Sequence, residues 1–427
     1  MRIALVACAL AILAPSHLRA GELMVELGVP ELLLPRQVQR FALDPRVFED
    51  ELREIIAALA LTSDNEAYHL RLSRSAVPML LDTTPLSGDM NITAIAPTGR
   101  QSRDGNFRFV GACDNNPCSL WLNGVLTQES NFMGTSFFTQ VIRTGSSVRG
   151  MAPDEVYYKS AAFDEPNRST IRIFGRLSGV PDYQPIRTIP NASSLFFHRW
   201  EFGFDASRDF LATAFREIPS GNIAVDLMPV EGEPVQGVLD VGTPSTPPTA
   251  AQGQIAARRI PTGVIDFDSG CFNSVNCFHV AWLGTNNTIR AAIINAATRQ
   301  AWGYDLGLFT AAFGIMNLSL FATDRGLFAM WFDPSLRLIQ LVLLTKFGEL
   351  LFGSAAVPEI TALRFVYFVL LTNALRGYFF MTVPSPSQKT GAIPGPPDAD
   401  ALSAGFYVTP FNITYPTPRR RAIRRAE

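Results

Sequence analysis

Two carboxylates alternate in Val264–Gly270, which reads VIDFDSG. Side chains two residues apart in a strand lie on one face, so Asp266 and Asp268 would point the same way. Two carboxyl groups held close together can divide the acid and base roles of glycoside hydrolysis. Glu201, in RWEFGFD, is a third acidic candidate. The structural alternative is that these residues form turns at strand ends, where Asp is common.

Four of the five cysteines form two close pairs, Cys113 with Cys118 and Cys271 with Cys277. Each pair encloses a short polar turn between strand-like segments. In an oxidising compartment each pair would form a disulfide at a hairpin tip. Free thiols and a shared zinc site are the alternatives, but zinc needs four ligands and no histidine cluster accompanies either pair.

Three histidines beyond the N-terminus, His69, His198 and His279, lie in apolar segments. We interpret them as buried histidines, each with one hydrogen bond; the alternative is a metal set around a central channel. The sequence contains no Walker loop, no G-x-S-x-G elbow and no H-E-x-x-H motif. It therefore predicts no metal and no cofactor.

The N-terminus indicates export. Residues 1–20 combine a basic residue, a short apolar run and small residues near Ala20, which is typical of a signal peptide cleaved before Gly21. A buried first helix is the alternative. Six N-x-S/T sequons support a secreted protein or one on a virion surface. Five are glycosylation candidates, and the sixth, Asn317, is the weakest because it lies within a predicted strand. The five candidates are Asn91, Asn167, Asn191, Asn286 and Asn412.

Composition limits the partners. Charged residues make up 17% of the chain and the formal net charge is −2. The arginines are scattered along the sequence, which argues against a nucleic-acid partner. A surface poor in charge favours a protein or glycan partner, or self-assembly. The C-terminus Pro418–Glu427 (PRRRAIRRAE) is a short basic tail; we interpret it as solvated, with docking on acidic lipid, glycan or nucleic acid, or a processing site, as alternatives.

The elements that would position these residues are strands. Asp205–Leu227 can be laid over Thr323–Leu344, since both read as turn, apolar strand, turn, apolar strand. This alignment equates two trios of residues on one face of a strand. The trios are Phe210, Ala212 and Ala214 in the first block, and Leu327, Ala329 and Trp331 in the second.

Such units recur seven times, at intervals of about 40 to 70 residues. In strand and turn rhythm the chain resembles β-propeller proteins. The resemblance implies an all-β fold with six or seven four-stranded blades. The expected organisation is a signal peptide (1–20), an N-terminal segment with a short helix (21–54), the propeller (55–384), and a final part with a loop, a closing strand and the basic tail (385–427).

Three further expectations concern single segments. Asp44–Leu59 has helical character, with Asp44 as N-cap and a proline at the first helical position. Leu23–Val29 or Gly405–Thr414 would supply a strand that closes the ring and removes exposed sheet edges. Leu306–Ala322 is uncharged, but its glycines and its alternation favour buried strands over a membrane helix. No transmembrane segment is expected once the signal peptide is removed.

Together these features predict a secreted, glycosylated binding or structural module in an extracellular or virion assembly. The alternative is a secreted carbohydrate-active hydrolase that uses Asp266, Asp268 and Glu201 at the channel.

Overall fold

The computed structural model describes part of the chain, and all statements below concern that part. The described residues are 22–43, 55–64, 66–86, 92–98, 108–113, 116–121, 126–128, 136–143, 156–163, 169–176, 183–192, 202–206, 210–217, 220–229, 238–242, 255–259, 276–284, 288–308, 316–345, 348–357, 363, 365–371, 373–384 and 402–416.

Five sheets of four antiparallel strands follow one another along the described chain. The first sheet holds β3 (Val38–Leu43), β4 (Ile55–Thr62), β5 (Ala67–Ser73) and β6 (Leu80–Pro85). The second holds β7 (Ile92–Thr98), β8 (Arg108–Cys113), β9 (Asn116–Trp121) and β10 (Leu126–Gln128). The third holds β11 (Ser136–Arg143), β12 (Val156–Phe163), β13 (Ser169–Arg176) and β14 (Tyr183–Pro190). The fourth holds β15 (Phe202–Ala206), β16 (Phe210–Arg216), β17 (Ile223–Pro229) and β18 (Val238–Gly242). The fifth holds β19 (Ile255–Arg259), β20 (Cys277–Leu283), β21 (Thr288–Asn295) and β22 (Gln300–Leu308).

The remaining nine strands form one sheet, the closing sheet. Its first unit holds β23 (Met316–Thr323), β24 (Gly326–Asp333), β25 (Leu338–Thr345) and β26 (Leu350–Ala356). Its last unit holds β27 (Phe365–Leu370), β28 (Arg376–Val383) and β29 (Gly405–Thr414), to which β1 (Glu22–Leu27) and β2 (Glu31–Leu34) add. β1 pairs with β29 antiparallel and with β26 parallel, and β2 pairs with β29.

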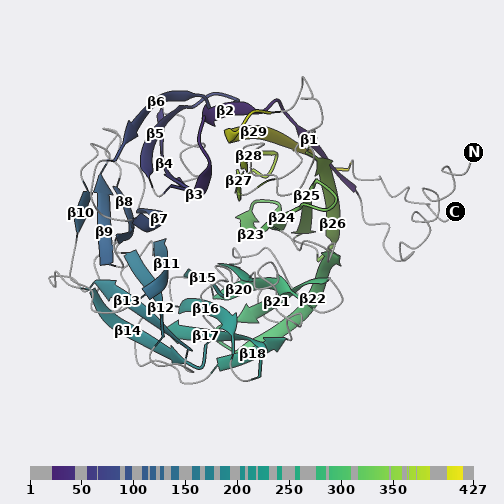
Figure 1. The fold of residues 1–427 in the computed structure, drawn as a ribbon. Helices are drawn as coiled ribbons and strands as arrows, with labels where there is room; N and C mark the ends of the chain where they lie inside the picture. Colours follow the sequence, from purple (N-terminus) through teal and green to yellow (C-terminus); the bar gives the residue numbers. More distant parts are fainter. Residues whose placement is uncertain are drawn as a thin grey trace, which may run out of the picture.

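The sheets are arranged in a ring (Figure 1). The leading strands of successive units contact one another in chain order: β3, β7, β11, β15, β19, β23 and β27, which returns to β3. N-terminal strands complete the last unit, so both ends of the described chain meet in one sheet. A buried hydrogen bond also fixes the junction, since the Thr382 hydroxyl donates to the Val38 carbonyl at 2.7 Å.

The core lies between neighbouring sheets. Phe41, Leu70 and Phe380 belong to one buried cluster that joins the first sheet to the last unit. The rings of Phe41 and Phe380 lie 4.7 Å apart between centroids. Because a middle strand is covered on both faces by neighbouring units, it buries nearly every residue: all eight residues of β24 are buried.

Two expectations about the N-terminal part change. The helix expected over Asp44–Leu59 is not confirmed, because Ile55–Leu59 belongs to β4, while residues 44–54 lie outside the described residues. Covered on both faces, this apolar segment is stable as a strand. The ring also begins earlier than residue 55 and ends later than 384, since it includes β1 to β3 and β29. Both expected closing segments belong to the last unit.

The uncharged segment Leu306–Ala322 contributes to β22 and β23 where it is described. Among the described residues, no helix has the length and apolar character needed to cross a membrane.

The proposed repeat is right in its elements and wrong in its register. β16 and β24 are both second strands of their units. Ala212 and Ala214 pack with Phe278 of the following sheet. Ala329 and Trp331 pack with Ala281 of the preceding sheet. The two trios therefore face opposite neighbours, and the alignment is shifted by one residue. Since both faces of these strands are buried, alternation carries no information about which face is which.

Connections alternate between the two edges of the ring because neighbouring strands are antiparallel. One edge is called the crossover rim. It holds the connections from the second to the third strand of each unit, and the connections from each unit to the next. The other edge, with the first-to-second and third-to-fourth connections, is the hairpin rim.

Candidate functional site

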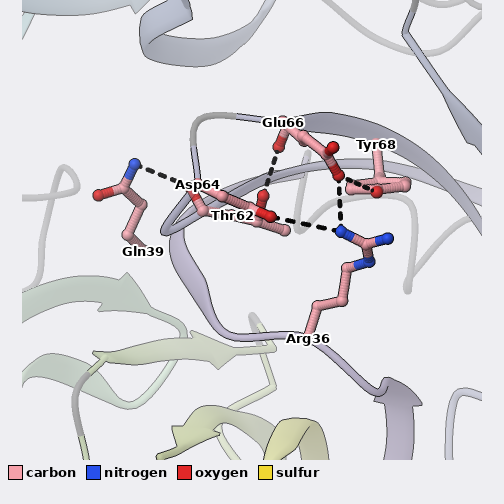
Figure 2. A network of polar contacts seen from close by, with 6 residues as sticks. All are labelled: Arg36, Gln39, Thr62, Asp64, Glu66 and Tyr68. Atoms are coloured by element: carbon pink, nitrogen blue, oxygen red, sulfur yellow. Dashed lines mark hydrogen bonds and ion pairs between the residues drawn. The ribbon is translucent and has the colours of Figure 1, made fainter.

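A polar cluster lies on the crossover rim where the ring closes (Figure 2). We call it the rim cluster. Its residues come from the β2–β3 connection, from β3, from the end of β4, from the turn between β4 and β5, and from β5. They are Arg36, Gln39, Thr62, Asp64, Glu66 and Tyr68.

Arg36 is the centre of the rim cluster. Its Nη1 lies 2.6 Å from Glu66 Oε2 and 3.4 Å from Asp64 Oδ2. Its guanidinium carbon lies 5.3 Å from the centroid of the Tyr68 ring, a cation–π distance. The Tyr68 hydroxyl donates to the same Glu66 oxygen. Arg36 thus bridges two carboxylates and an aromatic face.

Backbone contacts fix the turn that carries these side chains. The Thr62 hydroxyl and the Thr62 amide both donate to the Glu66 carbonyl at 2.9 Å. Gln39 Nε2 donates to the Thr62 carbonyl at 2.9 Å, and the Ser63 amide donates to the Gln37 carbonyl at 2.9 Å. The connection that enters from the last unit is therefore hydrogen bonded to the first sheet.

The rim cluster is suited to recognition of polar groups. Burial, and after it the hydrogen bond to Glu66, raises the pKa of Tyr68, so the phenol stays protonated at neutral pH. The side chains of Arg36, Asp64 and Glu66 are 46%, 57% and 52% exposed. Exposed pairs of this kind contribute little to stability, about 0 to 1 kcal/mol. Their donors and acceptors are held in place and remain accessible to a ligand.

A second polar pair is buried and joins the third sheet to the fourth. Arg187 on β14 donates from Nε to Asp226 Oδ2 on β17 at 3.1 Å, and from Nη2 to Oδ1. The Asp226 side chain is 1% exposed. This hydrogen bond to Asp226 is the main cause that raises the pKa of Arg187. The pair has the geometry of a contact between sheets, with no access for a ligand.

The predicted carboxylates Asp266, Asp268 and Glu201 lie outside the described residues. The strands that flank them are described. In the sequence, Asp266 and Asp268 lie between β19 and β20. Glu201 directly precedes β15 in the sequence. Their role as a site stays a prediction.

The cysteine pairs are described in part. Cys277, the first residue of β20, is fully buried and disulfide-bonded. Its expected partner, Cys271, lies outside the described residues. In the β8–β9 hairpin, Cys113 lies opposite Asn116 and Cys118 lies opposite Gly111. Cys113 and Cys118 therefore share a face as diagonal neighbours, and their pairing stays a prediction.

Two of the three histidines are described, and both are buried. His69 on β5 is 4% exposed and His279 on β20 is 0% exposed. Burial lowers the pKa of His279 to about 3 and that of His69 to about 4. No cluster of metal-ligating side chains is found in the described ranges. His198 lies outside them.

Three sequons can be compared. Asn191 is exposed in the turn after β14. Asn412 is exposed on β29, between Glu26 and Arg376 on the neighbouring strands. The side-chain amide of Asn317 donates to the Val366 carbonyl at 2.9 Å, so that nitrogen is already engaged. Asn91, Asn167 and Asn286 lie outside the described residues.

The sequence did not predict the rim cluster. Arg36 lies 28 residues from Asp64 and 30 from Glu66, and only the pairing of β3 with β4 brings them together. The sequence indicates a turn over Thr62–Glu66, but no sequence signal indicates that Arg36 contacts it.

Comparisons with known proteins identify the architecture. The WD40 domain of coronin from Toxoplasma gondii has a TM-score of 0.53 at 11% identity, covering 94% of this chain and 88% of that domain. The fold is a β-propeller. A lectin from Burkholderia pseudomallei, BP39L, has a TM-score of 0.47 at 11% identity, with 78% of this chain and 97% of that chain covered. The WD40 domain of SCAP from fission yeast has a TM-score of 0.45 at 9% identity, with 91% and 97% covered. No protein-family model and no curated protein matches the sequence.

Proposed function

We propose that this β-propeller is a binding or structural module of an extracellular or virion assembly, exported by its N-terminal signal and glycosylated. The ring would consist of seven blades, with β23–β26 and the last unit counted separately. In this proposal the crossover rim contacts a protein or glycan partner, or a second copy of the chain.

The observation that carries the proposal is the rim cluster. It holds a guanidinium, two carboxylates and a phenol in fixed positions, yet leaves the charged groups about half exposed. Their hydrogen-bonding capacity exceeds what closure of the ring requires. Preorganised polar groups of this kind lower the entropic cost of binding a partner.

Export is supported by residues 1–20 and by the sequons. Asn191, exposed in a turn, is the best placed of the described sequons for a glycan. Treatment of secreted protein with an N-glycosidase, followed by mass spectrometry, should show modification at Asn191 and none at Asn317.

The alternative function is a secreted carbohydrate-active hydrolase that uses Asp266 and Asp268, with Glu201 as a third carboxylate. The alternation of the two aspartates in sequence favours it. Fold alone does not decide, because one fold carries many activities.

The experiment compares two double variants of the purified, secreted protein. Arg36→Gln with Glu66→Gln removes the guanidinium of the rim cluster and one of its two carboxylates, and Asp266→Asn with Asp268→Asn removes the paired carboxylates. Each protein is tested on a glycan array, in sedimentation for self-association, and against a panel of glycan substrates for hydrolysis. A binding module should lose binding or self-association in the rim variant and keep it in the aspartate variant.

The opposite pattern would favour the hydrolase. Turnover of a glycan by the unaltered protein, lost by a factor of about 10² to 10⁴ in the aspartate variant, would replace the binding proposal. Circular dichroism of both variants checks that the loss does not come from unfolding.

A further inference from the structure

The outermost N-terminal strands carry an exposed strip of acidic and apolar side chains. Met24 is 59% exposed and Val29 is 80% exposed. Glu22, Glu26 and Glu31 are exposed around them. We call these five residues the closing strip, since they belong to the segment that completes the last unit. Exposed apolar side chains bordered by charge are typical of a contact surface.

The carboxylates of the closing strip have no partners. Within the described part of the chain, none of the three glutamates makes a hydrogen bond or ion pair through its side chain. Leu23, between the first two of them, points the other way and is 2% exposed in the core. The strip is thus an outward face whose carboxylates form no ion pair among the described residues; Arg376 lies two strands away from Glu26, across Asn412.

A basic segment of the same chain begins beside this strip. In the pairing of β1 with β29, Met24 lies opposite Thr414. Tyr415 is held at the hairpin rim by a hydrogen bond, which its hydroxyl donates to the Ala374 carbonyl at 2.7 Å. The description ends at Pro416, and residues 417–427 follow. They contain five arginines, one isoleucine and one glutamate, an excess of four positive charges.

The tail is long enough to cover the strip. Eleven extended residues span roughly 36 to 40 Å. The ten residues from Glu22 to Glu31 span at most about 33 Å. Since the tail is tethered next to Met24, its effective concentration at the strip is high, so that weak contacts suffice for docking.

We propose that residues 417–427 dock on the closing strip, with their arginines against Glu22, Glu26 and Glu31 and with Ile423 against Met24. The docked tail holds β1 against β29. The contact is electrostatic and exposed, so it weakens as salt is added. This inference does not depend on which partner the crossover rim binds.

The test measures hydrogen exchange of β1 in the full-length protein. One triple variant, Glu22→Gln with Glu26→Gln and Glu31→Gln, neutralises the strip. A second, Arg419→Gln with Arg421→Gln and Arg424→Gln, removes charge from the tail. At about 50 mM salt, the Glu22–Leu27 amides should exchange about threefold faster in both variants than in the unaltered protein. At about 500 mM salt, the exchange rates of the variants and the unaltered protein should be equal. Glu349→Gln, an exposed carboxylate in the β25–β26 turn, is the matched control and should change nothing.

Unchanged exchange in both triple variants would overturn the proposal, as would an effect of the strip variant alone. A synthetic peptide of residues 417–427 gives a second measurement: added to the tail variant, it should restore protection, and it should fail to do so on the strip variant. Exchange is measured at two protein concentrations. Protection that rises with concentration would mean that the tail docks on a second copy, which would overturn docking within one chain.

Discussion

Polar side chains buried between sheets govern how this protein responds to pH and to substitution. His69, His279 and Asp226 lie on middle or outer strands that face a neighbouring sheet, at 4%, 0% and 0% exposure. A group in such a position must stay neutral or be paired, because desolvation penalises an isolated charge. The two histidines illustrate the first solution and Asp226 the second.

The histidines predict a loss of stability in acid. Burial lowers the pKa of His279 from 6.5 to about 3. Burial is also the main cause for His69, whose pKa falls to about 4 with a further decrease from Arg71 and a partial opposition from Asp82. Below pH 6.5 the two histidines bind protons in the unfolded chain but remain neutral in the folded chain. The stabilisation is therefore complete above pH 6.5 and is lost as the pH falls toward 4 and 3, by up to about 1.4 kcal/mol per pH unit for each histidine.

Urea unfolding at pH 7.5, 6.0 and 5.0 measures this slope. The double variant His69→Gln with His279→Gln should show a flatter dependence over the same range, whatever its absolute stability. Equal slopes in the two proteins would contradict the assignment.

The buried pair predicts a large effect of one substitution. Arg187→Met leaves the Asp226 carboxylate buried without its cation, and removal of one partner of a buried pair costs about 3 to 5 kcal/mol. Arg71→Met is the control, because Arg71 and Asp82 lie 3.9 Å apart with 45% and 55% exposure. It should cost no more than about 1 kcal/mol. Denaturant unfolding at pH 7.5 compares them, and similar losses for the two variants would show that the buried pair has no special role.

At the scale of elements, middle strands were predicted more completely than edge strands, although β11, β23 and part of β26 were also predicted. Alternation and turn residues in the sequence predict strands over Ala67–Ser73, Val156–Phe163 and Thr288–Asn295, and these ranges match β5, β12 and β21 residue for residue. β5 and β21 are covered on both faces and read as apolar runs. By contrast, β6 exposes five of its six residues, so hydrophobicity gives little sign of it. Only its first residues were predicted, within Val77–Asp82, and the sequence pattern predicted no strand at β7, β14 or β22.

Candidate sites were harder to predict than strands, for a physical reason. The rim cluster depends on Arg36 reaching a turn that starts 26 residues later, and strand pairing alone brings them together. The register error in the repeat has a related origin, since a strand such as β24, buried on both faces, has no polar side to mark its orientation.

The β8–β9 hairpin predicts that its cysteines form a disulfide at the tip. Peptide mapping of secreted protein without reduction should show Cys113 linked to Cys118 and Cys271 linked to Cys277. Crossed links, or free thiols at Cys113 and Cys118, would refute this pairing. The loss of so short a loop constraint should destabilise the protein less than a bridge that closes a long loop.

At the scale of the whole molecule, the ring depends on strands from both ends of the described chain. β1 and β2 cover the edge of β29 and supply Leu23, Leu33 and Leu34 to the core, each at most 3% exposed. Full burial of three leucines contributes roughly 5 to 9 kcal/mol, which is comparable with the total stability of a typical domain.

Truncation tests this dependence. A chain that lacks residues 1–21 keeps β1 entire and should unfold at the same temperature as the unaltered protein. A chain that lacks residues 1–37 loses β1 and β2 and should be unfolded or aggregated at 37 °C. Thermal unfolding and size-exclusion chromatography compare the two. Equal melting temperatures would show that the N-terminal strands do not hold the ring together.

The bond from Thr382 to Val38 joins residues 344 positions apart, and β1 meets a strand that ends at Thr414. Synthesis runs from the N-terminus, so β1 and β2 exist for nearly the whole of translation before their partner is made. During that time their apolar side chains remain in water with open edges, a state that invites aggregation. Contacts of such high contact order also form slowly. We therefore expect closure to be the last and slowest step of folding, and the step at which a chaperone has most effect on yield.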